Sequence, residues 1–420
     1  MDRQLKGSVK LPGSKSESNR VLMVAAYGGF SFEMENGKRR TENGKLSEAH
    51  DTVLLKQTSL RAERSGAWQS TEEAIIDCED AGTVSRFLMS YLAGKPGTWI
   101  LTGTPRMCQR PMAPLVEALR QLGADIAYLG TDGCLPVKIN GKKLQGGSVS
   151  IDASQSSQFV SSLLMAAPTW ERGLKLQLKT DAVSMPYVDM TIAIMRHFGA
   201  EVERRADAIE VCPGTYQPRP FTVSPDWSAA SYWYEMAALS DDCDLLLEGL
   251  TPDSLQGDVV VAEWFKAFGV QSVYEPHGVR LTKTDDSPSQ EPLAFDFTMT
   301  PDLFPAVFVT CVALHRPAVF RGIQTLSLKE SDRVTSLLTE LLKCYHFDYS
   351  INNNEIILYK SSLLHYKLAS KSIVFDTFGD HRVVMALAGL FLKLGSVSFH
   401  HPEVVSKSYP TFWSDLQTNF

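Results

Sequence analysis

The sequence has little cysteine, no long hydrophobic run and no excess of positive charge, and each absence excludes a class of protein. Seven cysteines are scattered over 420 residues, without a CxxC pair or metal-type spacing, so neither a disulfide framework nor a zinc site is indicated. The most apolar run, Leu303 to Leu314, is too short to span a bilayer. A net charge of −7 argues against partners such as nucleic acid or an anionic membrane.

The remaining bulk features are those of an ordinary globular protein. The chain is 44% hydrophobic and 21% charged, and its length favours two or three domains. Met1 to Lys6 contain no apolar core of a signal peptide, which together with the scattered cysteines predicts a cytoplasmic location. We expect no metal and no cofactor.

A pattern of helix, glycine and two strands recurs along the chain. Its clearest copies turn at Gly123, Gly199 and Gly269, which lie 76 and 70 residues apart. A more diverged copy runs from Val334 to Tyr345, ahead of strands in Asp348 to Tyr359. Six such units fit the chain, and three per domain, with buried helices and outer sheets, is one arrangement; an accidental period stays open as the alternative.

Two stretches interrupt this pattern. Glu33 to Glu48 and Thr284 to Pro292 are rich in charged residues, serine or proline, and they predict surface loops.

Three segments place serine, threonine or glycine where a helix begins. They are Leu11 to Arg20, Asp80 to Phe87 and Ser154 to Phe159, and each offers unpaired backbone N–H groups to an anion. Arg106 and Arg110 lie in a loop closed by Pro111, and arginine suits carboxylate or phosphate. A serine-rich helix start alone is more often only a cap, but three in one acidic chain favour anion binding.

The C-terminal half supplies alternating charges. Lys329 to Arg333 changes sign within five residues and precedes an expected helix, although a solvated ion pair is the usual outcome of such a run. Asp302 precedes an apolar helix and by default would cap it. Asp380 to Arg382 and the isolated Lys407 are surface charges in most proteins. No single one of these segments defines a function.

Together and in this order, the segments closely resemble the 5-enolpyruvylshikimate-3-phosphate synthase family of enolpyruvyl transferases, from Leu11 to about Leu416. The most specific matches are Leu11 to Arg20, Ala81 to Thr83, Arg106 to Pro111, Ser156 to Gln158, Ser184 to Tyr187, Lys329 to Arg333, Asp380 to Arg382, and Lys407.

The resemblance implies an α/β (α+β) fold of two similar domains. Each would contain three βαβαββ units with buried helices and outer sheets, an inside-out α/β barrel. Residues 14–225 would form the lobe that binds shikimate 3-phosphate. Residues 1–13 and 226–420 would form a discontinuous second lobe with the phosphoenolpyruvate and acid/base residues, and the active site would lie in the cleft between them. A monomer is the family expectation.

The implied reaction transfers the enolpyruvyl group of phosphoenolpyruvate to the 5-hydroxyl of shikimate 3-phosphate, by addition and elimination through a tetrahedral ketal. Asp302 would take the hydroxyl proton, while Glu330 and Lys15 would share proton delivery and return; which of the two donates stays open. The residues expected to bind shikimate 3-phosphate are Lys15, Ser16, Arg20, Ser156, Ser157, Gln158, Ser184, Tyr187, Asp302 and Lys329. Those expected to bind phosphoenolpyruvate are Lys15, Gly82, Arg110, Gln158, Arg333, Arg382 and Lys407.

The sequence also departs from the family pattern, and two alternative functions stay open. Asp80 stands where the family most often has asparagine, and we expect its side chain to cap the following helix. The sister family that transfers enolpyruvyl to UDP-N-acetylglucosamine uses a loop cysteine, so Cys108 must be weighed, although it lies only two residues before Arg110. A catalytically silent binding relative is the third alternative. Glyphosate is expected to compete with phosphoenolpyruvate, with Gly82 leaving room for it.

Overall fold

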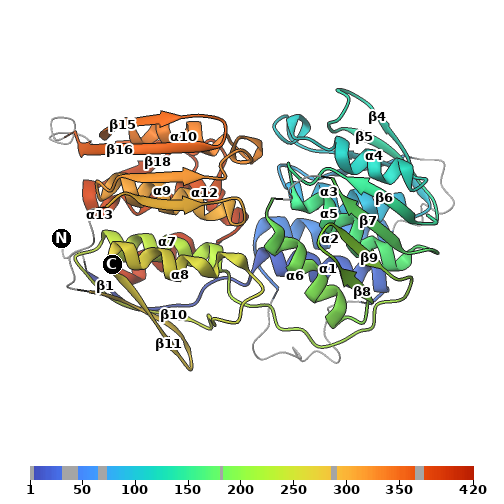
Figure 1. Ribbon diagram of the computed structural model, residues 1–420, viewed down its shortest axis with the longest axis horizontal. Helices are drawn as coiled ribbons and strands as arrows, with labels where there is room; N and C mark the ends of the chain where they lie inside the picture. The colour runs from blue at the N-terminus through green and yellow to red at the C-terminus, as the bar shows by residue number, and fades with distance from the viewer. Residues whose placement is uncertain (1–3, 31–45, 65–72, 180–182, 285–290, 365–372) are drawn as a thin grey trace. The chain divides into compact units, whose positions relative to one another are not determined.

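The computed structural model describes residues 4–30, 46–64, 73–179, 183–284, 291–364 and 373–420. The chain divides into two compact units (Figure 1). Unit 1 comprises Met1–Ser14, Glu48–His50 and Ser224–Phe420, and unit 2 comprises Lys15–Ser47 and Asp51–Val223. Most of the two predicted surface loops, Glu33 to Glu48 and Thr284 to Pro292, lies outside the described residues.

Unit 2 contains two four-stranded sheets with the same connectivity. Their strand orders are β2-β3-β5-β4 and β6-β7-β9-β8, and in each sheet the first pair is parallel while the other two pairs are antiparallel. The strands are β2 (Ala74–Asp77), β3 (Gly97–Thr102), β4 (Asp125–Tyr128), β5 (Val137–Gly141), β6 (Gly147–Ile151), β7 (Leu174–Leu178), β8 (Val202–Arg204) and β9 (Ala208–Val211). The helices are α1 (Lys15–Gly28), α2 (His50–Arg64), α3 (Gly82–Ala93), α4 (Ala113–Gln121), α5 (Ser157–Ala166) and α6 (Met185–His197). Each sheet with its two connecting helices is one βαβαββ unit.

Unit 1 repeats this arrangement in two sheets, ordered β1-β10-β12-β11 and β13-β14-β16-β15, and adds the parallel pair β17-β18. The strands are β1 (Gln4–Val9), β10 (Asp242–Glu248), β11 (Val270–Glu275), β12 (Gly278–Lys283), β13 (Leu293–Asp296), β14 (Ala318–Arg321), β15 (Tyr345–Ile351), β16 (Glu355–Leu363), β17 (Ile373–Phe375) and β18 (Val397–Phe399). The helices are α7 (Trp227–Leu239), α8 (Val261–Trp264), α9 (Phe304–Ala313), α10 (Arg333–Leu341), α12 (His381–Ala388), α13 (Phe391–Leu394) and α14 (Phe412–Asn419).

The helices between the sheets form the core. Every residue of α7, α9 and α12 is buried, and α3 and α5 each have a single residue that is not fully buried. A helix that is apolar all round must be covered on all sides, and here the sheets and the neighbouring helices cover it. The strands alternate between buried and exposed positions, as in β10, so the sheets face the core on one side and solvent on the other.

The three repeat glycines have a common structural role. Gly123, Gly199 and Gly269 have φ values of +97°, +90° and +78°, each just after a helix and before a pair of antiparallel strands. Glycine adopts this left-handed conformation without the steric cost of a Cβ atom, which explains its place at the end of the helix. The recurring pattern therefore reflects repeated structural units rather than an accidental period.

Candidate active site

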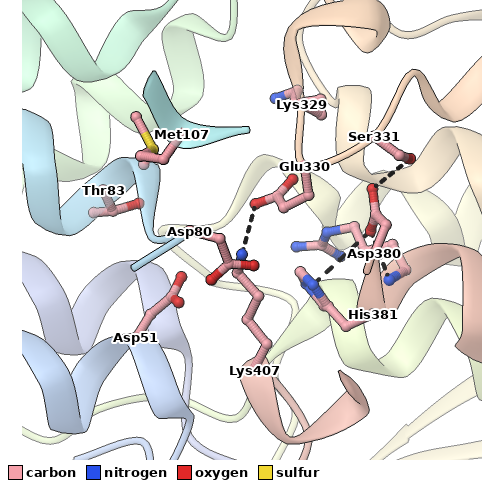
Figure 2. A network of polar contacts seen from close by, with 12 residues as sticks. Asp51, Asp80, Thr83, Met107, Lys329, Glu330, Ser331, Asp380, His381 and Lys407 are labelled. Atoms are coloured by element: carbon pink, nitrogen blue, oxygen red, sulfur yellow. Dashed lines mark hydrogen bonds and ion pairs between the residues drawn. The ribbon is translucent and has the colours of Figure 1, made fainter. Parts of the chain in front are cut away.

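Unit 1 brings together seven charged side chains that we call the C-terminal cluster. Asp302 comes from the 3₁₀ turn Pro301–Leu303, and Lys407 ends the 3₁₀ segment Pro402–Lys407. The other members lie at or just before the first turns of α10 and α12, and Figure 2 labels Lys329, Glu330 and Asp380 among them. The full set is Asp302, Lys329, Glu330, Arg333, Asp380, Arg382 and Lys407.

Arg333 lies at the centre of the C-terminal cluster, and its side chain is 1% exposed. Its Nη1 donates to Asp302 Oδ1 at 2.8 Å, its Nη2 to Glu330 Oε2 at 3.0 Å and its Nε to Asp380 Oδ2 at 2.9 Å. Burial disfavours the charged guanidinium, but these three carboxylates outweigh burial and raise its pKa. Lys329 to Arg333 is therefore not the solvated ion pair that is usual for such runs, because Arg333 is buried and contacts three carboxylates.

Asp302 is shared by several cations. Oδ1 accepts from Arg333, Oδ2 accepts from Arg382 Nη2 at 2.8 Å, and Lys329 Nζ lies 3.9 Å from Oδ1. Burial favours the protonated acid, yet the charges of Arg382, Lys329 and Arg333 hold the pKa of Asp302 well below its usual range. Asp302 is therefore ionised at every physiological pH and is a weak base while these arginines hold it.

Glu330 joins Lys407 to the C-terminal cluster. Figure 2 shows their side chains pointing toward each other, with Lys407 Nζ 3.7 Å from Glu330 Oε1. Both side chains are largely buried. Lys329 extends from the same segment and is more exposed than Glu330. The site thus contains a carboxylate, Glu330, in contact with two cations, Arg333 and Lys407.

Asp380 holds other members of the C-terminal cluster in place, a role that the sequence did not reveal. It caps α12 by accepting from the backbone N–H of Arg382 at 2.9 Å, and it also accepts from Ser331 Oγ at 3.2 Å. Its side chain is fully buried. One carboxylate therefore fixes the helix start, the Ser331 hydroxyl and the Arg333 guanidinium together.

In unit 2, Arg20 connects the first turns of α1 and α6. Its guanidinium donates to Thr191 Oγ1 at 2.6 Å, to the carbonyls of Ser16 and Tyr187 at 2.9 and 3.1 Å, and to Ser161 Oγ at 3.3 Å. Burial lowers the pKa of Arg20 to about 10, which leaves it charged at neutral pH. Arg20 therefore organises the helix starts from within the unit.

The first turns of α3 and α5 meet at Gln158. Its amide donates to Thr83 Oγ1 at 3.0 Å, and its Oε1 accepts from Arg86 Nη1 at 2.5 Å. Ser156 caps α5, since its hydroxyl accepts from the Gln158 backbone N–H at 3.3 Å. Ser157 is buried in the same turn. Neither Thr83 nor Arg86 was among the predicted site residues, although both lie one turn or less from Gly82.

Gly82 allows Arg110 to lie against the start of α3. A Cβ atom on Gly82 would come within 2.7 Å of Arg110 Nη1. Arg110 is buried and donates weakly to the carbonyl of Asp80 at 3.4 Å. The prediction that the Asp80 side chain caps this helix is wrong: α3 begins at Gly82, and Ala81, which has no side-chain acceptor, occupies the N-cap position.

Lys15 and Ser184 complete the predicted residues of unit 2. Lys15 Nζ pairs with Asp51 Oδ2 at 3.0 Å, and Asp51, in the first turn of α2, is almost fully buried. Ser184 precedes α6 with φ +57°, a left-handed conformation that a non-glycine residue adopts at some energetic cost. Such conformations concentrate at functional sites. We refer collectively to these separate contact groups of unit 2 as the N-terminal cluster, which comprises Lys15, Arg20, Asp51, Thr83, Arg86, Arg110 and Gln158.

The structure therefore groups the predicted residues by unit. Asp302, Lys329, Glu330, Arg333, Arg382 and Lys407 form one contact network in unit 1. In unit 2, Arg20 is linked to Ser16 and Tyr187, and Gln158 is linked to Ser156. Within the described residues, no group of three or more His, Cys, Asp or Glu side chains has the geometry of a metal site. The described helices also include none that is long and apolar enough to cross a membrane.

The fold defines the class of protein. An EPSP synthase from Acinetobacter baumannii has a TM-score of 0.72 at 22% identity, covering 99% of this chain and 96% of that one. An enolpyruvyl transferase from Streptomyces tendae has a TM-score of 0.69 at 14% identity, covering 99% and 95%. The mixed α/β enolpyruvyl transferase fold, predicted from the sequence, is thus confirmed.

Sequence comparison identifies the family within that class. The family model for EPSP synthase (3-phosphoshikimate 1-carboxyvinyltransferase) matches residues 1–416. A 3-phosphoshikimate 1-carboxyvinyltransferase of Bacteroides fragilis is 39% identical over 99% of this chain and 95% of its own, and that of Methanoculleus marisnigri is 35% identical over 96% and 94%. The chain belongs to the EPSP synthase family, which confirms the resemblance read from its motifs.

Proposed function

We propose that this chain converts phosphoenolpyruvate and shikimate 3-phosphate to 5-enolpyruvylshikimate 3-phosphate and phosphate, as a 3-phosphoshikimate 1-carboxyvinyltransferase (EC 2.5.1.19) of the shikimate pathway to chorismate and the aromatic amino acids. The observation that carries the proposal is the C-terminal cluster, where four cations are in contact with three carboxylates. Two anionic substrates need such preorganised cations to react.

In this proposal the arginines and Lys407 receive phosphoenolpyruvate. Arg333, Arg382 and Lys407 are held in place by carboxylates, so their positions are set before a ligand arrives. From unit 2, Arg110 would hold the same substrate beside Gly82 and Gln158, with Lys15 reaching both substrates. Planar guanidinium groups bind phosphate and carboxylate by paired hydrogen bonds, which supports this assignment.

Shikimate 3-phosphate is assigned to the helix starts of unit 2. Ser156, Ser157 and Ser184 lie at the first turns of α5 and α6, where backbone N–H groups favour phosphate. Lys15, Ser16, Arg20, Gln158 and Tyr187 would complete this pocket, and Asp302 and Lys329 would bind the ring hydroxyls. Because Arg20 already has four acceptors within the unit, it contributes chiefly charge and organisation.

The addition step needs a base, and the contacts of Asp302 suggest how it becomes one. While Arg333 and Arg382 hold it, its pKa is well below the useful range. The anionic groups of phosphoenolpyruvate compete for the same two arginines, and their loss weakens the forces that lower the pKa of Asp302. Substrate binding would thus raise the proton affinity of Asp302 when the 5-hydroxyl must be deprotonated.

We assign proton transfer at the methylene carbon of phosphoenolpyruvate to Glu330 and Lys15. A proton adds to that carbon, the 5-hydroxyl oxygen attacks the adjacent carbon, and a tetrahedral ketal forms. Removal of a proton from the new methyl group then expels phosphate and restores the double bond. Glu330 contacts Arg333 and Lys407, so it lies beside the groups assigned to the reacting substrate. The reaction balances without a metal or another cofactor.

The two clusters would act on one pair of substrates, with residues 14–225 forming one lobe, residues 1–13 and 226–420 the other, and the reaction in a cleft between them. We further propose a cytoplasmic enzyme, as the scattered cysteines favour, and a monomer, as the family resemblance implies. Its partners are then the two small substrates, with no nucleic acid or membrane.

The test is phosphate release from phosphoenolpyruvate that depends on shikimate 3-phosphate. Asp302→Asn and Glu330→Gln should each lower kcat by about 10²- to 10⁴-fold with substrates saturating, because each removes an acid or base of similar shape. Asp253→Asn, an exposed carboxylate of unit 1, is the matched control and should retain activity. Near-normal turnover in both cluster variants would remove the catalytic assignments.

The same assay separates the rival functions. Release that depends on UDP-N-acetylglucosamine, or a large loss in Cys108→Ser, would favour the sister transferase. Cys108 Sγ donates to the carbonyl of Gly103 at 3.4 Å, a contact that a serine hydroxyl retains. We therefore expect Cys108→Ser to keep turnover within about twofold. Binding of both substrates without phosphate release would favour a catalytically silent relative.

A further inference from the structure

Asp258 is a buried carboxyl group that the proposed reaction does not use. It lies in the 3₁₀ segment Gly257–Val260, beside the first turn of α7, and is 1% exposed. Its Oδ2 accepts a short hydrogen bond from Ser228 Oγ. Its Oδ1 accepts no hydrogen bond from the part of the chain that the structure describes.

Gln256, which precedes this segment, contacts the residues that follow one crossing of the chain between the units, at Val223–Ser224. Gln256 donates to the carbonyl of Pro225 at 2.9 Å and accepts from the Trp227 N–H at 3.0 Å. Asp226 caps α7 by accepting from the Ser228 N–H at 2.8 Å. Asp258 is thus fixed to α7, whose next turn carries Tyr232, and the Tyr232 hydroxyl accepts from Arg382 Nη1 at 3.5 Å.

Asp258 is electrostatically coupled to the C-terminal cluster. Burial is the main cause that raises its pKa to about 7, and the negative charges of Asp302 and Asp226 act in the same direction. Arg382 and the hydrogen bond from Ser228 oppose them. These groups belong to the start of α7, the turn before α9 and the first turn of α12. Its charge therefore changes within the physiological pH range.

The net charge of the C-terminal cluster makes the protonation state of Asp258 important. Lys329, Arg333, Arg382 and Lys407 supply four positive charges, and Asp302, Glu330 and Asp380 supply three negative charges. The formal charges of these seven groups therefore sum to +1 while Asp258 is protonated. An ionised Asp258 cancels it, attracts Arg382 and repels Asp302.

We propose that Asp258 is a positioning residue for phosphoenolpyruvate: in its protonated form it leaves Arg382 paired with Asp302 and the cluster positive, and in its ionised form it weakens the hold on the substrate. This inference rests on the proposed function, because it assigns phosphoenolpyruvate to the C-terminal cluster. Asp258 touches neither substrate; it acts through Arg382 and Asp302.

The experiment measures KM for phosphoenolpyruvate between pH 5.5 and 9 in the unaltered enzyme, Asp258→Asn and Asp253→Asn. Phosphoenolpyruvate itself titrates in this range, so the ratio of KM values between proteins at each pH is the quantity compared. Asparagine keeps the hydrogen bond from Ser228 but cannot ionise. We expect KM of the unaltered enzyme to exceed that of Asp258→Asn by about threefold to tenfold above pH 8, and the two to agree below pH 6.

A second variant protects the test against a misfolded Asp258→Asn. Ser228→Ala removes a hydrogen bond that favours the ionised carboxylate, so the pH at which KM rises should move upward. Asp253→Asn, which is exposed, should follow the unaltered enzyme at every pH. A pH dependence of KM that is the same in all four proteins would overturn the inference while leaving the proposed function intact. Absence of substrate-dependent phosphate release at every pH would instead overturn the proposed function.

Discussion

At the scale of single residues, Gly82 shows how a missing side chain positions a cation. An alanine Cβ would lie 2.7 Å from Arg110 Nη1, too close for the guanidinium to stay in place. The end of a long side chain moves at little cost, so we expect Gly82→Ala to fold normally with Arg110 displaced. From the sequence alone, the expected effect of the added methyl group is that it intrudes on the ligand. The structure adds a second effect, the displacement of Arg110.

Gly82→Ala should therefore raise both KM for phosphoenolpyruvate and the inhibition constant of glyphosate, each by about tenfold or more, because a charge-assisted contact is weakened. Steady-state inhibition by glyphosate against varied phosphoenolpyruvate measures both. Gly214→Ala is the control, since a Cβ there meets no atom within 4 Å. An inhibition constant that stays the same in Gly82→Ala would contradict the assigned position of the inhibitor.

Several residues whose roles sequence reasoning missed are carboxylates with partners far away in the chain. Asp51 pairs with Lys15 across 36 positions of the chain, and Asp380 binds Arg333 across 47. Asp258 stands in a segment with no motif that the sequence analysis identified. The cationic site residues could be predicted because they stand in distinctive motifs of the family. The burial that makes these carboxylates important depends instead on tertiary packing.

At the scale of elements, α7 contains an unusual buried acid. Glu235 is 0% exposed, and neither of its carboxylate oxygens has a hydrogen-bond partner among the described residues. Gly389, at the end of α12, lies so close that an added Cβ would be 3.0 Å from Glu235 Oε1. Burial raises the pKa of Glu235 well above 4.5, so it is protonated in the folded protein.

This protonation makes the stability of the fold depend on pH. The folded state retains a proton that the unfolded chain loses above about pH 4.5, so the contribution of Glu235 to stability is fully present below that pH and falls as pH rises toward its folded pKa.

Glu235→Met removes the buried polar group, and we expect the free energy of unfolding to increase by about 1 to 3 kcal/mol at pH 7, with a larger gain at pH 8.5. Urea unfolding at pH 5, 7 and 8.5 measures this, with the exposed Glu201→Met as control. An equal or smaller gain at pH 8.5 would contradict a protonated Glu235.

Helix starts were predicted better than their capping residues. Ser156 caps α5 as its sequence suggests, and Asp332 and Asp380 cap α10 and α12. The prediction for Asp80 was wrong although acidic residues are common helix caps. Here Ala81 is the N-cap residue, and α3 begins at Gly82. Local preference fixes where a helix can begin within a few residues, and packing decides the final position.

At the scale of the whole molecule, the acidic net charge of −7 coexists with two groups of buried or half-buried cations. The sequence could predict the repeated units, because the turning glycines and their spacing are local. The βαβαββ units implied four strands each, but the pairing order, in which a parallel pair joins a hairpin, depends on contacts far apart in the chain that the local pattern does not contain.

The two clusters lie in separate units, and the proposed reaction requires both to act on one pair of substrates. We therefore expect shikimate 3-phosphate together with glyphosate to lower the radius of gyration measured by small-angle X-ray scattering, because bound anions draw cations of both units together. Inorganic phosphate at the same ionic strength is the control and should change it less. Under conditions where glyphosate fully inhibits turnover, a radius of gyration that is the same with and without the ligands would contradict a closure driven by ligand binding.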